Sequence, residues 1–248
     1  MVSLHGWRAS IYMGSCFFAM TQANAGAGEP AGPDRYAAAR CRMVAQDLQG
    51  RDIGDSAVLA AMAKVPRHLF VDGRHQAEAY ADHPLPIGEN QTISQPYIVA
   101  LMTQHLKLKK TDRVLEVGTG SGYQAAVLAE VAGRVYTIEL NKSLAGQAEK
   151  LLRALGCDTV SVRCGDGFFG WPEQAPFDAV MLTCAPVQIP QPLIDQLCEG
   201  GRIIAPVGGV LQVQELLLGT KKQGRLNFQT IAPVRFVPMR GQAEKNTL

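Results

Sequence analysis

The sequence lacks the residue patterns that are typical of metal sites, repeat proteins and nucleic-acid binders. Its six cysteines form no C-x-x-C pair and its five histidines are scattered, so we expect no metal site. No long basic tract accompanies the net charge of +2, and we therefore expect no nucleic-acid partner. No internal repeat is visible. A chain of 248 residues that is 47% hydrophobic is instead typical of a single enzyme domain with a full core.

The sequence also lacks an apolar run long enough to span a membrane, although a short one lies near the N-terminus. Arg8 precedes the apolar stretch 11–20, and the tripeptide Ala-Asn-Ala at 23–25 resembles a signal-peptidase site. The stretch is too short for a membrane-spanning helix, so we expect no stable membrane association. Cysteines within predicted core elements indicate a reducing cytosol. We therefore expect a cytoplasmic protein, with export to the periplasm as the alternative if residues 1–25 act as a signal peptide.

A glycine-rich turn follows a predicted buried strand in the run VLEVGTGSGY, residues 114–123. Glycines at alternate positions allow a tight turn against a bulky ligand, and the helix starting near Ser121 points its amide-rich N-terminus at that ligand. The spacing G-x-G-x-G differs from the G-x-G-x-x-G of dinucleotide sites. Glu116 stands two residues before the first glycine. A carboxylate there would repel a pyrophosphate and would suit a positively charged ligand such as S-adenosylmethionine. A turn that merely needs glycine is the alternative.

Two more acidic residues stand at the ends of the next two predicted strands. Glu139 ends the run RVYTIEL and lies seventeen residues beyond Gly122, where a carboxylate can accept both ribose hydroxyls. Its alternative role is a charge near the N-cap of the helix beginning near Asn141. Asp166, in a Gly-Asp-Gly turn, is placed to reach an adenine amino group, or else belongs to an ordinary turn. Because successive strands of a parallel sheet end at one crevice, these features together predict one cofactor site.

The order of elements predicts an α/β protein. Strands alternate with helices from residue 113 onward, which is typical of a parallel sheet with helices on both faces. We expect these strands at 113–117, 134–139, 160–163, 177–182 and 202–206, and an antiparallel edge at 212–220 and 227–238. Before them we expect helices at 34–49, 56–64 and 96–106, with Asp55 or Ser56 as N-cap of the second, and an irregular stretch at 82–95. Residues 1–33 would be a leader and linker, and 34–248 a single domain.

The irregular stretch carries the most specific motif, because loops this long in a compact domain are usually functional. It contains QTISQP, residues 91–96. Together with VLEVGTGSGYQAAVLA, GDGFFGW, FDAVMLTCAP, IPQPLIDQLCEGG and VRFVPM, this motif resembles the protein-L-isoaspartate (D-aspartate) O-methyltransferase family. The resemblance covers residues 34 to 241. Cys184 stands where the family more often has alanine, and the apolar leader also departs from the family pattern.

The resemblance implies a Rossmann-like S-adenosylmethionine-dependent methyltransferase fold. A helical cap and substrate loop would occupy 34–95, and the cofactor-binding core and C-terminal strands would occupy 96–240. The cofactor would be S-adenosyl-L-methionine, with S-adenosyl-L-homocysteine as the product. The substrates would be proteins and peptides with L-isoaspartyl or D-aspartyl residues, methylated on the free α-carboxylate so that the ester cyclises to a succinimide and repair begins. We expect a monomer.

The same resemblance assigns residues to the site. Ser94 takes the position of the active-site serine, and its expected role is to orient the substrate carboxylate, since no histidine and acid stand nearby in sequence to activate it. The N-cap of the helix at Pro96 is the alternative role for Ser94. Further substrate-binding residues would be Thr92, Ile93, Arg235, Phe236 and Val237. The cofactor-binding residues would be Gln95, Glu116, Gly118, Thr119, Gly120, Ser121, Gly122, Tyr123, Glu139, Leu140, Gly165, Asp166, Gly167 and Thr183.

The C-terminal segment 234–239 would border the substrate cleft. Its strand edge is placed to pair with the main chain of an extended peptide, with plain core packing as the alternative for its apolar side chains. An α-carboxylate has a pKa of roughly 3.5 and needs no strong base near neutrality. Orientation of the two reactants can then supply up to roughly 7 to 11 kcal/mol of the catalysis.

Three other functions fit part of the pattern. One is a methyltransferase with the same cofactor that acts on a small molecule or RNA. Another is a nicotinamide-dependent oxidoreductase, against which Glu116 and the glycine spacing count. The third is an inactive protein that binds the cofactor or damaged chains, against which the intact QTISQP motif counts.

Overall fold

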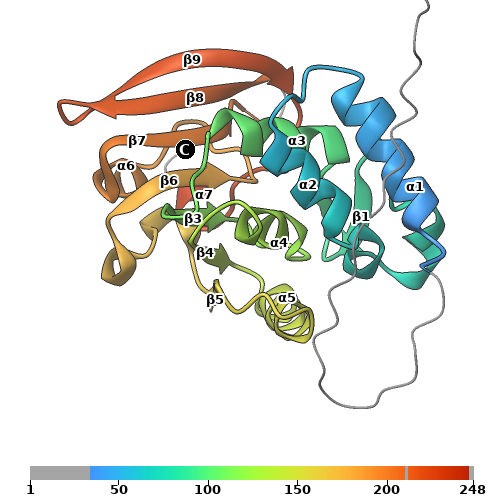
Figure 1. The fold of residues 1–248 in the computed structure, drawn as a ribbon. Helices are drawn as coiled ribbons and strands as arrows, with labels where there is room; N and C mark the ends of the chain where they lie inside the picture. The colour runs from blue at the N-terminus through green and yellow to red at the C-terminus, as the bar shows by residue number, and fades with distance from the viewer. Residues whose placement is uncertain (1–33, 210–211, 246–248) are drawn as a thin grey trace, which may run out of the picture. The chain divides into compact units, whose positions relative to one another are not determined.

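A seven-stranded sheet forms the centre of the fold (Figure 1). The computed structural model describes residues 34–209 and 212–245, so the leader and linker expected at 1–33 lie outside the described residues. The strand order is β5-β4-β3-β6-β7-β8-β9. The strands are β3 (Arg113–Val117), β4 (Arg134–Glu139), β5 (Val160–Cys164), β6 (Phe177–Leu182), β7 (Leu197–Val207), β8 (Gln214–Lys222) and β9 (Arg225–Val234).

The pairing confirms the expected α/β fold with an antiparallel C-terminal edge. The first five strands in this order pair in parallel, whereas β8 is antiparallel to both β7 and β9. The largest differences from the expected bounds are that β7 begins at Leu197 instead of 202 and that β9 ends at Val234 instead of 238. Beyond Val234 the chain leaves β8 because the Gln214 side chain binds both main-chain groups of Phe236, at 2.6 and 3.1 Å.

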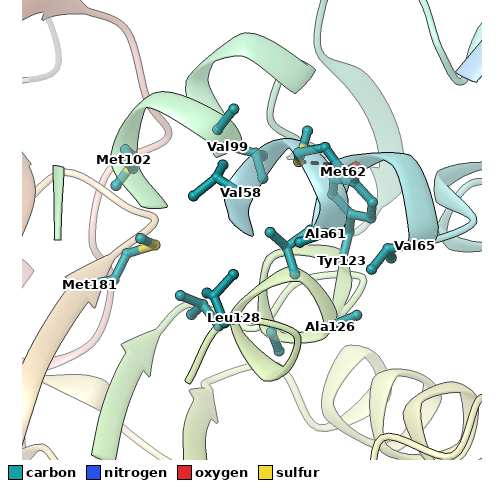
Figure 2. Packing of buried hydrophobic residues seen from close by; sticks show 14 of the residues in the cluster. Val58, Ala61, Met62, Val65, Val99, Met102, Tyr123, Ala126, Leu128 and Met181 are labelled. Carbon is teal, nitrogen blue, oxygen red and sulfur yellow. Dashed lines mark hydrogen bonds between the residues drawn. The ribbon is translucent and has the colours of Figure 1, made fainter. Parts of the chain in front are cut away.

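Both faces of the inner parallel strands β3, β4 and β6 are buried, which explains their largely apolar sequences. Successive side chains alternate between two cores: Val114 of β3 faces one core, and Leu115 faces the other. Figure 2 shows the first core, where side chains of β6, α2 (Ser56–Lys64), α3 (Pro96–His105) and α4 (Tyr123–Ala129) meet. The hydroxyl of Tyr123 reaches the sulfur of Met62 there, at 3.6 Å.

Side chains cap two of the helices, and one of these caps was expected. The Asp55 carboxylate accepts hydrogen bonds from the N–H groups of Ala57 and Val58 and so caps α2. The Asn141 side chain caps α5 in the same way and accepts from Ser143 and Leu144. The other helices are α1 (Ala37–Arg42), continued by the π-helix η1 (Met43–Gln49), α5 (Lys142–Ala154), α6 (Gln191–Asp195) and α7 (Gln242–Lys245). Short 3-10 helices are η2 (Arg67–Phe70), η3 (Gly73–Glu78), η4 (Gly167–Phe169) and η5 (Pro172–Gln174).

The stretch 82–95 is more regular than the sequence predicts. Strands β1 (Leu85–Gly88) and β2 (Gln91–Ile93) form an antiparallel hairpin with Leu85 opposite Ile93. The turn residues Glu89 and Asn90 both have positive φ, at 52° and 55°, as a two-residue hairpin turn requires. The prediction of an irregular stretch is therefore wrong, because strands this short, one of them containing proline, give no alternating pattern.

No helix within residues 34–209 or 212–245 combines the length and the apolar character that a membrane span requires.

Candidate active site

A cavity of about 350 Å³ lies at the carboxyl ends of the central strands, where a parallel sheet places its ligand site. Its wall comes from four parts of the chain: the hairpin and its exit 89–94, one side of α3, the turns that follow β3, β4, β5 and β6, and the C-terminal segment 237–240. The strand order reverses between β3 and β6. The connections that leave these two strands therefore run to opposite sides of this cavity. The sequence motifs before and after β3 thus meet at one place.

Gly118 and Gly120 of the glycine turn after β3 line the cavity, whereas Gly122 does not. Gly118, Gly120 and Gly122 have φ values of 102°, 53° and 90°, which other residues adopt only at a cost. A Cβ atom at Gly118 would overlap the Thr183 hydroxyl. The helix that follows begins at Tyr123, not near Ser121, because Gly122 itself is the N-cap. Thr119, Ser121 and Tyr123 line the cavity as well.

Glu139 joins the glycine turn to the end of β4. Its carboxylate accepts hydrogen bonds from the N–H of Gly120 at 2.8 Å and from the N–H of Asn141 at 2.9 Å. The side chain is 8% exposed and lines the cavity next to Leu140. Asn141, not Glu139, provides the side-chain cap of α5. The carboxylate therefore lies where a ligand's hydroxyls can reach it, and it also holds the turn in place.

Asp166 and Gly165 do not line the cavity, although Gly167 does. The Asp166 carboxylate accepts from the N–H of Phe168 at 2.9 Å, which caps η4, and from the N–H of Gln242 at 2.8 Å. The geometry thus matches the turn-stabilising alternative for Asp166. Thr183 lines the cavity, and its hydroxyl donates to the carbonyl oxygens that end β3.

The QTISQP motif forms the opposite wall. Thr92, Ile93 and Ser94 all line the cavity, and Ser94 is half-buried. The predicted alternative for Ser94, the N-cap of α3, is wrong: the N-cap is Gln95, and it makes no side-chain cap bond. Asp82 binds the N–H of Tyr97 instead, at 2.9 Å.

Gln95 does not line the cavity, contrary to its predicted contact with the cofactor. Its side-chain amide donates to the Asp82 carboxylate at 3.2 Å, which turns it away from the ligand. The same carboxylate binds Arg51 at 3.1 Å. Asp82 thus holds the start of α3 against the N-terminal helices.

The C-terminal segment contributes different residues from those predicted. Val237 lines the cavity with Pro238, Met239 and Arg240, whereas Arg235 and Phe236 do not. The segment is held by a bridge to Ala185, whose N–H donates to Val237 O and whose carbonyl accepts from Met239, both at 2.8 Å. With Phe236 bound to Gln214, much of the edge predicted to pair with a peptide is already paired within the chain.

Several wall residues had no signal in the sequence. Among the described residues that line the cavity, Arg240 is the only one with a basic side chain. Only the path of the chain after Val237 places it there, since no motif singles it out. Burial raises the pKa of the Cys184 thiol to about 12, so this wall residue is uncharged near neutrality. Pro238 and Met239 belong to the segment that was expected to border the cleft, and the remaining wall residues without a prediction are Glu89, Gln91, Ile98, Val99, Met102, Val117, Gln124, Ile138 and Asn141.

Known proteins share this arrangement. The family model of the protein-L-isoaspartate(D-aspartate) O-methyltransferases matches residues 39–244. The chain belongs to this family. It is 53% identical to protein-L-isoaspartate O-methyltransferase 2 of Shewanella sediminis over 214 residues, which cover 86% of this chain and 88% of the relative.

Solved structures agree with the fold of this methyltransferase. A protein-L-isoaspartate O-methyltransferase that is 29% identical superposes with a TM-score of 0.78, over 84% of this chain and 69% of that one. A putative family member from Plasmodium falciparum, in complex with S-adenosyl-L-homocysteine, is 24% identical and has a TM-score of 0.69, over 81% of this chain and 98% of that one. The Rossmann-like methyltransferase fold and the family inferred from the sequence are confirmed.

Glu116 of this methyltransferase does not reach the cavity, contrary to its predicted contact with a cationic ligand. The side chain is 0% exposed and lies beneath the glycine turn on the face of β3 that Val114 shares. One carboxyl oxygen accepts from the Thr137 hydroxyl at 2.6 Å, and the other is buried without a partner among the described residues. Burial, and to a lesser extent the charge of Glu139, raises the pKa of Glu116 to about 8, although the Thr137 bond opposes this.

The raised pKa of Glu116 predicts a pH dependence of stability. The contribution of Glu116 to the free energy of unfolding is full below pH 4.5, which is the pKa of the group in the unfolded chain. This contribution is lost as the pH rises toward 8, because over that range only the unfolded chain releases the proton. The free energy of unfolding should fall by up to roughly 1.4 kcal/mol per pH unit there. Urea denaturation of the wild type and of Glu116→Gln, which cannot ionise, at several pH values from 5 to 8 measures the difference. Parallel curves for the two proteins would show that Glu116 is ionised in the fold.

Proposed function

We propose that the chain transfers a methyl group from S-adenosyl-L-methionine to the free α-carboxylate of L-isoaspartyl and D-aspartyl residues in damaged proteins and peptides, which starts their repair. Family membership supports this activity. The observation that carries the proposal is that Ser94 of the QTISQP motif and Glu139 at the end of β4 line the same cavity. The binding site of the methyl donor therefore lies next to the binding site of the acceptor carboxylate.

The residues present fit the cofactor. A volume of about 350 Å³ lies within the usual range for small-molecule sites, and its wall combines the glycine turn with the Glu139 carboxylate. We propose that Glu139 accepts the ribose hydroxyls and that the turn 118–123, Leu140, Gly167 and Thr183 contact the rest. Glu116, Gln95, Gly165 and Asp166 would hold these walls from behind. When bound, the cofactor supplies a methyl group that its sulfonium already activates.

Residues of the opposite wall would orient the acceptor. The substrate carboxylate has a pKa of roughly 3.5, so it is ionised near neutrality and no side chain needs to remove a proton. We propose that the Ser94 hydroxyl donates a hydrogen bond to one carboxylate oxygen and leaves the other in line with the methyl carbon. Thr92, Ile93 and Val237 would flank it. Catalysis then comes from orientation, as expected for two reactants that are both activated before they meet.

We also propose an oligomeric state and a compartment. The active form would be a monomer. Cysteine usage and the cytosolic cofactor support a cytoplasmic enzyme. N-terminal sequencing of the protein from its native cell would show whether residues 1–25 are removed. Their removal would favour export to the periplasm over a cytoplasmic location.

Peptide specificity tests the proposed activity. We expect labelled methyl groups from S-adenosylmethionine to appear on an L-isoaspartyl peptide in base-labile form, because the product is a carboxyl ester. The matched peptide with ordinary aspartate is the control and should stay unlabelled. Labelling of RNA or of a small metabolite in place of the peptide would favour the other methyltransferase function, and calorimetric binding of NAD would favour the oxidoreductase.

Substitution of Ser94 tests its role. Ser94→Ala removes one hydrogen bond to a charged oxygen, so we expect kcat/KM for the isoaspartyl peptide to fall by about tenfold to a hundredfold. The Kd of S-adenosylmethionine, measured by calorimetry, should not change. Equal losses of cofactor affinity and of methyl transfer would contradict an orienting role.

The sequence and the structure indicate different arginines for contact with the negatively charged substrate, namely Arg235 and Arg240. Arg240 lies on the cavity wall and Arg235 does not, so Arg240→Gln should raise the peptide KM about two- to fivefold, as expected for an exposed charge, and more at low salt. The matched change Arg235→Gln should have the smaller effect. A larger rise for Arg235→Gln would return the substrate contact to the residue predicted from the sequence.

A further inference from the structure

A fully buried arginine lies behind the Ser94 loop. Arg67, the first residue of η2, is 0% exposed. Its Nε donates to the carbonyl oxygen of Ala79 and its Nη2 donates to that of Ser94, both at 2.7 Å. The guanidinium carbon lies 4.8 Å from the centre of the Tyr123 ring. One side chain thus joins the N-terminal cap to the substrate loop and to the first residue of α4.

Packing alone does not account for an arginine here. None of the ion pairs found among the described residues includes Arg67, and its Nη1 is buried without a hydrogen-bond partner. Desolvation by burial lowers the pKa of the guanidinium, which shows that the charge is held at a cost. An apolar side chain of similar volume would fill the space without that cost.

The hydrogen bond from Arg67 to the Ser94 carbonyl affects the direction in which the Ser94 side chain points. Ser94 links Ile93, buried at the end of β2, to Gln95, the N-cap of α3. Asp82 fixes the Gln95 side, since it binds both the Gln95 side chain and the N–H of Tyr97. Arg67 binds the carbonyl of Ser94 itself, so the rotation of that peptide plane is set. The Ser94 side chain, which lines the cavity, is oriented by this backbone.

We propose that Arg67 is a positioning residue for methyl transfer, whose guanidinium fixes the Ser94 backbone so that the Ser94 hydroxyl faces the acceptor carboxylate. Arg67 does not line the cavity and acts through Ser94, which does. The inference rests on the orienting role proposed for Ser94.

Two substitutions separate the hydrogen bonds from the charge. Arg67→Met keeps an apolar stem but removes both carbonyl bonds, and kcat for an isoaspartyl peptide should fall by about tenfold to a hundredfold, as displacement of a catalytic group by about 1 Å predicts. Arg67→Lys keeps one donor and should lose less. The Kd of S-adenosylmethionine should change by less than about twofold in both, because the glycine turn and Glu139 are intact.

Arg202 offers a matched control. Its guanidinium also binds a main-chain carbonyl, that of Lys107 at 2.9 Å, together with the Asp112 carboxylate at 2.8 Å, but it does not line the cavity. Arg202→Met should lower the melting temperature without changing kcat of the folded enzyme. An equal loss of kcat in Arg202→Met would show that general destabilisation explains the Arg67 variants.

A double-mutant cycle with Ser94→Ala decides the inference. If Arg67 acts through Ser94, Arg67→Met and Arg67→Lys should lower kcat in the wild type but have little effect when Ser94 is alanine. The same fold loss in both backgrounds would overturn the inference and leave Arg67 a structural residue. If Arg67→Met does not fold, Arg67→Lys completes the cycle. No loss in Ser94→Ala alone would overturn the proposed role of Ser94 and, with it, this inference.

Discussion

The parallel pairing of β3 with β4 is the constraint on which the site depends. It places Val117 opposite Ile138, so that the N–H of Gly118 binds the Ile138 carbonyl at 2.8 Å. One step further along, the N–H of Gly120 meets the Glu139 carboxylate. A shift of this register would separate the turn from the acid, because each residue of slip turns the side chains to the other face. The cofactor seat is therefore a consequence of sheet geometry.

The acceptor wall depends on side chains that bind main-chain groups across long stretches of sequence. Arg67 and Asp82 hold the two sides of the Ser94 loop, and Gln214 holds the segment that carries Val237 to the cavity. Such bonds are directional, so they fix orientation where apolar contacts alone would allow sliding. A reaction that relies on the alignment of two reactants needs walls of this kind more than it needs a strong base.

The sequence predicted the bounds of β3, β4 and β6 because these strands are buried on both faces and are therefore rich in apolar residues. It also predicted Asp55 as one of two candidates for the cap of α2, which depends only on local geometry. It missed the β1–β2 hairpin, whose strands are too short to alternate, and it placed Arg235 instead of Arg240 at the cavity. The position of Arg240 depends on the bridge to Ala185, a contact between distant segments that no local pattern encodes.

Glu116 shows why the chemistry of a motif residue cannot be read from its position alone. The sequence places this acid beside the ligand turn, but the alternation of β3 directs its side chain beneath the turn, toward Thr137, and Thr137 in turn contacts Thr119. Near neutrality a carboxyl with a pKa of about 8 is mostly protonated, so it supplies little charge to a cationic ligand. The acidic residues at the cavity wall are Glu139, which is held there by two N–H donors, and Glu89 on the hairpin. Burial thus gives two neighbouring acids different tasks: Glu116 supports the turn from below, and Glu139 faces the ligand.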